Sequence, residues 1–401
     1  MPYSTILMDR RNFLKISSAL GAIAAPLSSQ AKEGSVTEQA QLASTPPVLM
    51  SPTDSSISVV WRVNQHTKGY VEYGTSADQL DQRADGDSWG MRPSGDDTIK
   101  VKIGNLNAAT RYYYRTVTET FKTKDPLVET SQVREFTTLS AHNKTSHFTV
   151  WNDTHKHNDT IKALFEKVSP DSEFMLWNGD ISNDWNQRED IPNTILNPAG
   201  IDFKFPIIPL RGNHDLRGSH AGDLQDFVSS DNDLPWTAFR TGPVAVICLD
   251  TGEDKDDDHP YLFGRISCHD MRVAQAKWLE SVIQQPEFRD APYRIVCCHI
   301  PLRWIDEETD HGYDWFSKRS RTLWHDSLVK WGTQAIVSGH THRTALLEGS
   351  KEFPYAQIVG GGPKLEQATI ITCKADADQL VIHSKLLKGE TVHKLTFKPI
   401  S

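Results

Sequence analysis

Five short polar tracts each follow a run of apolar residues in this sequence, and each contains Asp, Asn or His. The tracts are residues 152–155 (NDTH), 178–184 (NGDISND), 211–215 (RGNHD), 298–301 (CHIP) and 339–342 (GHTH). Each tract alone is typical of a polar turn or loop. Five of them in one chain indicate a shared site, because carboxylate, amide and imidazole groups together bind divalent metal ions.

Two divalent ions held about 3.5–4 Å apart need a shared anionic ligand that relieves their mutual repulsion. Asp180 follows the flexible Gly179, and we predict that its carboxylate bridges the two ions. The other predicted ligands are Asp153, His155 and His342 for one ion, and Asn213, His299 and His340 for the other. Nitrogen and oxygen donors without a thiolate favour Mn, Fe or Zn over Cu(I). Room for water and substrate oxygens at each ion indicates a catalytic site rather than a structural one.

The elements that must position these tracts alternate between strands and helices. Strands are predicted at residues 147–151, 174–177, 205–210, 244–249, 294–298 and 335–337, and helices at residues 160–168, 273–283 and 317–331. Continuous apolar strands between helices predict an α/β domain, whose sheet is covered on both faces and carries functional residues beyond its strand ends. Strand signals return at residues 379–383 and 392–397, and we expect them to complete a second sheet within a domain spanning 146–401.

Residues 46–140 are predicted to form a small all-β sandwich. The strand signals are at residues 56–63, 69–73, 100–103, 111–117 and 133–138, with turn residues between them. Three consecutive tyrosines, residues 112–114, would suit a carbohydrate-binding platform. On a strand with alternating faces, however, we expect one core tyrosine between two exposed ones.

The N-terminal residues 1–31 resemble a twin-arginine signal peptide. The pattern RRNFLK at residues 10–15 precedes a short apolar run and an A-x-A-like cleavage site, SQA, at residues 29–31. This predicts export through the twin-arginine machinery to the periplasm or beyond, and a polar linker follows at residues 32–45. Cleavage would remove one acidic and three basic residues and change the net charge from −9 to −11.

Composition excludes several other classes of protein. A hydrophobic content of 38% and a charged content of 24% are those of a soluble globular protein. The net charge of −9 argues against a general nucleic-acid binder, and we expect no specific nucleic-acid or membrane partner. Five cysteines in a chain of 401 residues do not form a disulfide framework.

In this order the motifs D-x-H, G-D, G-N-H-D, H-x-P and G-H-x-H resemble the calcineurin-like metallophosphoesterase superfamily, over about residues 146–345. The resemblance implies two packed β-sheets flanked by helices, with a dinuclear metal site at the strand ends. The tracts VVWRV, GYVEYGTS and LNAATRYYYR within residues 46–140 resemble the fibronectin type III-like module that precedes the catalytic domain in purple acid phosphatases and related bacterial enzymes.

Two positions depart from the purple acid phosphatase pattern. That branch has a Tyr three residues after the bridging Asp, and here the position holds Asn183. It also lacks the histidine that this chain supplies as His155. Without the tyrosinate we expect no charge-transfer colour, so the chain resembles a non-purple relative.

The resemblance implies hydrolysis of a phosphoric ester by metal-activated water. His214 is then placed to donate a hydrogen bond or a proton to the leaving alkoxide, with Asp215 as its candidate orienting partner. Four arginines near the tracts are left unassigned, because an Arg near a site is as often a solvated neighbour: Arg211, Arg217, Arg303 and Arg343. The acidic run at residues 253–258 lacks the residue placement of an EF-hand and is expected to be a solvated loop.

The function predicted from the sequence is therefore an exported, metal-dependent phosphomonoesterase acting on a small phosphate ester. A phosphodiesterase acting on cyclic nucleotides or other diesters is the first alternative. A non-catalytic binding protein of the cell envelope is the second, and it is disfavoured because all seven predicted ligands are present.

Overall fold

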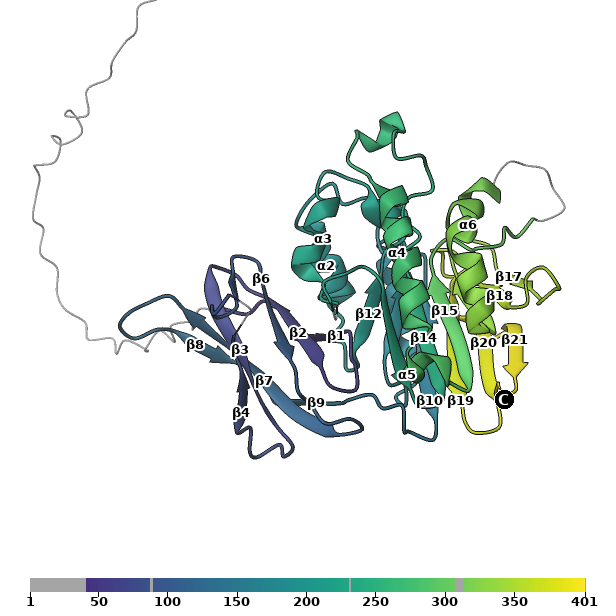
Figure 1. Ribbon diagram of the computed structural model, residues 1–401. Helices are drawn as coiled ribbons and strands as arrows, with labels where there is room; N and C mark the ends of the chain where they lie inside the picture. Colours follow the sequence, from purple (N-terminus) through teal and green to yellow (C-terminus); the bar gives the residue numbers. More distant parts are fainter. Residues whose placement is uncertain (1–40, 87–88, 231, 307–313, 401) are drawn as a thin grey trace, which may run out of the picture. The chain divides into compact units, whose positions relative to one another are not determined.

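The computed structural model in Figure 1 describes residues 41–86, 89–230, 232–306 and 314–400. The predicted signal peptide, residues 1–31, and residues 32–40 of the predicted linker lie outside the described residues. Among the described residues, every helix is too short or too polar to span a bilayer.

A nine-stranded mixed sheet carries three of the polar tracts. Its order is β21 (Thr391–Phe397), β20 (Leu380–Leu386), β19 (Thr369–Ala375), β10 (Ser146–Trp151), β11 (Met175–Asn178), β12 (Ile207–Leu210), β1 (Val48–Met50), β2 (Ile57–Arg62) and β6 (Thr98–Ile103). Strands β10, β11 and β12 are parallel neighbours, with Val150 opposite Leu176 and Leu176 opposite Ile208. Their carboxyl ends therefore lie at one edge of the sheet.

A six-stranded sheet carries the other two tracts. Its order is β13 (Thr237–Thr241), β14 (Val244–Leu249), β15 (Tyr293–Cys298), β16 (Ala335–Ser338), β18 (Ala356–Val359) and β17 (Ala345–Leu347). Strands β14, β15, β16 and β18 are parallel. All residues of β14 are buried, as expected for a parallel strand covered on both faces.

The two sheets pack face to face around one core. Phe148 and Val150 of the first sheet share a buried cluster with Val246, Ile295 and Val337 of the second. The predicted fold, two packed sheets in an α/β domain, is confirmed. The last strands do not complete the second sheet, contrary to expectation, because β20 and β21 extend the nine-stranded sheet that contains β10.

Helices cover the outer faces of both sheets (Figure 1). On the nine-stranded sheet they are α1 (Asn158–Lys167), α2 (Asp190–Ile195) and α3 (Leu224–Phe227), and on the six-stranded sheet α4 (Cys268–Val282), α5 (Pro286–Arg289) and α6 (Asp314–Trp331). Short 3-10 turns are η1 (Pro198–Gly200), η2 (His214–Leu216), η3 (Ala221–Asp223) and η4 (Pro260–Leu262). Helix α1 uses Ile161 and Leu164, three residues apart, to pack against Trp151 and Trp177 of the sheet.

A third sheet completes the N-terminal region. It contains β4 (Gln82–Ala84), β3 (Thr67–Gly74), β7 (Arg111–Thr120) and β8 (Val128–Thr130), with β5 (Ser94–Gly95) paired to β3 and β9 (Arg134–Thr137) paired to β7. The predicted exposure of the three tyrosines was wrong. Tyr112 and Tyr114 are buried against Phe136, and Tyr113 between them is half-buried, because it is the even-numbered positions that face the core of this module.

The N-terminal β region is joined to the α/β domain through the backbone. Strand β1 lies parallel to β12, with Met50 opposite Ile207, and β2 and β6 extend the same sheet. The sequence signals predicted a separate sandwich without β1, which is only three residues long. Residues 41–401 group as one unit. All five cysteines are free and buried.

Candidate metal centre

The five polar tracts converge at the carboxyl ends of parallel strands from both sheets. Asp153 follows β10, Asp180 follows β11, Asn213 follows β12, His299 follows β15, and His340 and His342 follow β16. Backbone bonds tie the first two tracts together, from the Asp153 N–H to the Gly179 carbonyl (3.1 Å) and from the His155 N–H to the Asp180 carbonyl (3.0 Å). The predicted ligands are thus positioned by rigid strands rather than by free loops.

Five of the predicted ligands adopt a left-handed backbone conformation. The φ angles are 52° for Asp153, 46° for His155, 48° for Asp180, 71° for His340 and 54° for His342. This region is uncommon for residues other than glycine, and each such residue costs about 1–3 kcal/mol. Backbone strain concentrated on these side chains indicates a functional site.

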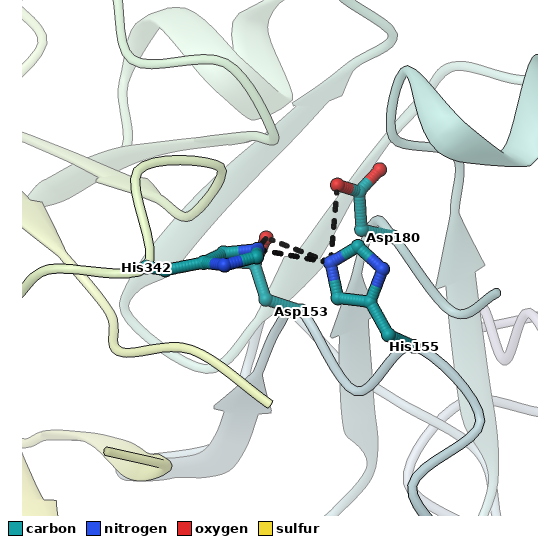
Figure 2. Close-up of side chains that lie close together, drawn as sticks. All are labelled: Asp153, His155, Asp180 and His342. Carbon is teal, nitrogen blue, oxygen red and sulfur yellow. Dashed lines mark hydrogen bonds and ion pairs between the residues drawn. The ribbon is translucent and has the colours of Figure 1, made fainter. Parts of the chain in front are cut away.

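Four ligand-type side chains form a first group, drawn in Figure 2: Asp153, His155, Asp180 and His342. One ligand atom from each lies within 4.8 Å of the others. The Nε2 atom of His155 lies 3.5 Å from Oδ2 of Asp180, and Nε2 of His342 lies 3.4 Å from Oδ1 of Asp153. The two imidazole nitrogens are 3.0 Å apart.

A second group consists of Asp180, His299 and His340, and one ligand atom from each again lies within 4.8 Å of the others. Nε2 of His299 lies 3.1 Å from Oδ2 of Asp180. The side-chain oxygen of Asn213 lies 2.8 Å from Nδ1 of His340, which adds the amide oxygen predicted for this group. Asp180 belongs to both groups, as a bridging ligand would.

Buried charge in the centre favours a bound cation. Asp153, Asp180 and His299 are at most 1% exposed. Burial would raise the pKa of Asp180, but the charge of His299 outweighs it and holds the pKa well below its usual range. For His299, burial lowers the pKa, and the charges of Asp180 and Asp153 together raise it to about 10. A divalent metal ion can neutralise these buried carboxylates and bind the imidazoles in place of the protons they hold without it.

Hydrogen bonds leave the inner atoms of the predicted ligands free to coordinate. Among the described residues, Oδ1 of Asp153 and Nε2 of His299 are buried without a hydrogen-bond partner. The other carboxylate oxygens accept hydrogen bonds from the backbone. The N–H of His340 donates to Asp153 (2.8 Å), and the N–H of His214 donates to Asp180 (2.9 Å). Nδ1 of His299 donates to the Asn178 carbonyl (2.9 Å), which fixes the orientation of its ring. This donor set fits a metal.

Two glycines of the tracts are required by close approach to these carboxylates. A Cβ atom at Gly212 would lie 2.2 Å from Oδ1 of Asp180, and one at Gly339 would lie 2.3 Å from Oδ2 of Asp153. Both distances are far shorter than a non-bonded contact. Any side chain at either position would displace a predicted ligand.

His214 lies beside the first group, with its ring in edge contact with that of His155. Its Nδ1 lies 2.9 Å from the Asn183 carbonyl and therefore donates to it. Nη1 of Arg217 lies 3.0 Å from Nε2 of His214, and because a guanidinium only donates, Nε2 accepts. Burial, and to a lesser degree Arg217, lower the pKa of His214 despite the nearby Asp180.

Asp215 does not orient His214, contrary to the expectation from the sequence. Its buried carboxylate accepts the backbone N–H groups of Gly212 (2.8 Å), Ser182 (3.1 Å) and Ile181 (3.2 Å). Burial raises its pKa to about 7. The tight turn η2 directs consecutive side chains apart, so Asp215 joins the tracts after β11 and β12 while His214 faces the site.

Two buried acids near the site were missed because the run at residues 253–258 was expected to be solvated. Glu253 is fully buried, and Asp254 is 13% exposed at its side chain. Both pair with Arg217, at 2.6 Å and 2.9 Å. The signal in the sequence was that this run begins four residues after the buried strand β14, like the other tracts.

The remaining unassigned arginines have partners outside the two groups. Arg211 pairs with Asp250 (2.7 Å), Arg343 pairs with Asp306, and Arg303 donates to the Glu348 carbonyl (2.8 Å). Arg217 is therefore the arginine that contacts the predicted catalytic histidine.

Comparison with known proteins agrees with this geometry. Residues 146–344 match the family model described as Calcineurin-like phosphoesterase. The chain carries a calcineurin-like phosphoesterase domain. Residues 46–138 match the model described as Purple acid Phosphatase, N-terminal domain. The matched family is described as a phosphoesterase family, as the sequence motifs predicted.

Curated relatives of the phosphoesterase domain include Serine/threonine-protein phosphatase CPPED1. The mouse (Mus musculus) protein is 26% identical over 195 residues, which is 46% of this chain and 58% of the relative. The zebrafish (Danio rerio) protein is 25% identical over 194 residues, with the same coverage. The match thus spans less than two thirds of these relatives.

Two solved structures share the fold over most of the chain. Purple acid phosphatase PPD1 from yellow lupin (Lupinus luteus) has a TM-score of 0.64 and 14% identity, covering 88% of this chain and 74% of its own. The structure of PhoD has a TM-score of 0.59 and 11% identity, covering 88% and 90%. Both comparisons extend the likeness in fold beyond the phosphoesterase domain.

Proposed function

We propose that the protein is an exported phosphomonoesterase that uses two divalent metal ions, with Mn, Fe or Zn as the candidates. The observation that carries this proposal is the position of Asp180, whose buried carboxylate belongs to both ligand groups. Two ions that share one carboxylate are the arrangement that activates water and clamps a phosphoryl group.

The predicted ligands divide between the ions as the geometry groups them. Asp153, His155 and His342 would hold one ion, Asn213, His299 and His340 the other, and Asp180 both. The ions would supply activation of water and charge neutralisation on the phosphate. Arg217 offers its guanidinium beside His214, so the pair would bind the phosphate or the leaving-group oxygen.

Asn183 supports a non-purple enzyme. It stands where the purple branch has tyrosine, and its side chain is an amide that has no phenolate to offer. An iron-to-tyrosinate band has no source at this position.

Export is proposed from the twin-arginine pattern at residues 10–15. This route carries folded proteins, so the metals would be acquired in the cytoplasm before export. Fusion of residues 1–45 to a reporter, with RR replaced by KK as the control, tests the route. Export that survives the replacement would contradict it.

A metal and substrate panel tests the activity. Metal content is measured beside hydrolysis of p-nitrophenyl phosphate, bis-p-nitrophenyl phosphate and a cyclic nucleotide. We expect about two ions per chain and the highest kcat/KM for the monoester. A higher kcat/KM for the diesters would establish a phosphodiesterase instead. A protein inactive on all three after Mn²⁺ addition would indicate a binding protein.

A further inference from the structure

A cavity of 400 Å³ lies next to the predicted catalytic histidine, and the function proposed above leaves it without a role. Three segments line it, one at residues 184–186, one at 217–219 and one at 261–265. The first two segments are continuations of the tracts that carry Asp180 and His214. The cavity is therefore built from the same loops as the metal centre.

Direct backbone contact holds the first two segments together. The N–H of Trp185 donates to the carbonyl of Arg217 at 2.9 Å. Gly218 has a φ of 91°, and a Cβ atom there would lie 2.4 Å from the carbonyl carbon of Trp185. Only glycine allows this approach, so this wall of the cavity has a fixed position relative to the metal ligands.

Arg217 connects the cavity to the site. Its side chain lines the cavity, yet the residue is only 7% exposed and is clamped by Glu253 (2.6 Å) and Asp254 (2.9 Å). From this clamp its Nη1 reaches Nε2 of His214 at 3.0 Å. A group in the cavity would therefore lie next to the pair proposed to act on the leaving-group oxygen.

Two aromatic residues also line the cavity. Phe263 is 81% exposed and Tyr261 is 50% exposed, and the guanidinium of Arg217 lies 5.8 Å from the Tyr261 ring centroid. Phe263 also has a φ of 54°, a conformation that is an outlier for a bulky side chain. The Phe263 ring is thus exposed to water although its backbone conformation is energetically unfavourable. A ligand that covers the ring would explain both features.

We propose that this cavity binds the alcohol part of the substrate and selects an alcohol that carries an aromatic ring. This inference rests on the proposed phosphomonoesterase function and names its substrate class. Tyr261 and Phe263 would stack on the ring, and the guanidinium of Arg217 would lie against it. Arg265 at the same cavity has no ion pair among the described residues, so its guanidinium is a second group that can pack on the ring.

The test compares two esters with alkoxide leaving groups of similar reactivity, 2-phenylethyl phosphate and n-propyl phosphate. For the metal-loaded, full-length mature protein we expect kcat/KM to be roughly 10-fold higher for the ring ester. Phe263→Ala and Tyr261→Ala should each reduce this ratio several-fold, and Phe263→Tyr should restore it. Phe121→Ala, at a ring 56% exposed in the N-terminal region, is the matched control and should leave the ratio unchanged.

Binding of the phosphonates 2-phenylethylphosphonate and n-propylphosphonate separates this inference from the proposed function. A preference for the ring phosphonate that Phe263→Ala removes would support the cavity, even in a protein that hydrolyses neither ester. Equal affinities for the two phosphonates, or a preference that survives both alanine variants, would overturn the inference. Hydrolysis of both esters at equal kcat/KM would overturn it while leaving the phosphomonoesterase proposal intact.

Discussion

Nε2 of His299 lies 3.1 Å from Oδ2 of Asp180 at the carboxyl ends of strands from two different sheets. The same oxygen lies 3.5 Å from Nε2 of His155, on the other side of the centre. One carboxylate oxygen thus faces imidazoles of both ligand groups. The candidate metal centre depends on the packing of the two sheets, because neither sheet contains both histidines.

Replacing Asp180 by asparagine keeps the shape of the side chain and removes its charge. We expect bound metal to fall below two ions per chain and kcat/KM to fall by more than about 100-fold, because the shared anion is lost. Metal analysis and hydrolysis of p-nitrophenyl phosphate measure both effects. Asp171→Asn, at an exposed aspartate, is the control. A fully loaded and active Asp180→Asn protein would rule out the bridging role.

Gly212→Ala tests the close packing behind the same carboxylate. The new Cβ would lie 2.2 Å from Oδ1 of Asp180, so we expect weaker metal binding and a loss of about 1–3 kcal/mol in the free energy of unfolding. Gly222→Ala is the matched control, since a Cβ there has no atom within 4 Å. Equal effects of the two substitutions on metal affinity would contradict this interpretation.

His214→Ala separates catalysis from metal binding. The bond from the residue 214 N–H to Asp180 belongs to the backbone and survives the change, so both ions should remain bound. As an acid, His214 would need a proton on Nε2 and therefore release of the bond that Nε2 accepts from Arg217. Removing an acid catalyst costs about 10²–10⁴-fold in rate, and less for a good leaving group such as p-nitrophenolate than for an alkyl phosphate. Metal content and kcat/KM for both ester types provide the measurement. Equal losses for the two leaving groups would show that His214 does not donate the proton.

The iron-loaded protein should have no tyrosinate-to-iron absorption band in the visible range. Asn183 replaces the tyrosine of the purple branch, and its amide side chain cannot form a tyrosinate-to-iron bond. A visible absorption spectrum of the protein after reconstitution with iron tests this expectation. A purple preparation would mean that a tyrosine from elsewhere in the chain reaches the metal.

Glu173, a residue outside the candidate metal centre, should make the stability of the fold depend on pH. Burial raises its pKa above the ordinary value, although it accepts from Thr241 and from the His147 N–H. The folded state therefore disfavours the charged form, and the penalty develops as pH rises through the ordinary value of 4.5 towards the raised pKa. Glu173→Gln should gain stability relative to the wild type between pH 4 and pH 7 in thermal unfolding. A constant difference across this range would contradict the assignment.

The sequence could bring the residues of the candidate metal centre together because each predicted ligand follows a buried apolar run. Parallel strands bring such ends to one edge, so Asp153, Asp180 and Asn213 could be placed together without knowledge of the side-chain geometry. His299 and His340 follow apolar runs in the same way, although their strands belong to the second sheet and not to the first. The resemblance to the metallophosphoesterase superfamily then implied that two sheets pack together.

Other features depend on contacts that a local pattern does not contain. Whether Tyr112 or Tyr113 faces the core depends on the register of β7 within its sheet. Glu253 is buried because Arg217, 36 positions away, neutralises it. Asp215 was paired with the adjacent His214, but the turn η2 directs it to the backbone of Ser182 instead.

The parallel pairing of β1 with β12 has a consequence for any fragment of this protein. A phosphoesterase domain prepared from residue 146 onward would leave β12 with an unpaired edge, including the carbonyl of Ile207 that accepts from the Ser51 N–H. Bare edges of this kind recruit strands from neighbouring molecules. By pairing with β12, the N-terminal region covers this edge and thereby disfavours self-association. Crystallisation or engineering of the domain should therefore retain residues 46–63.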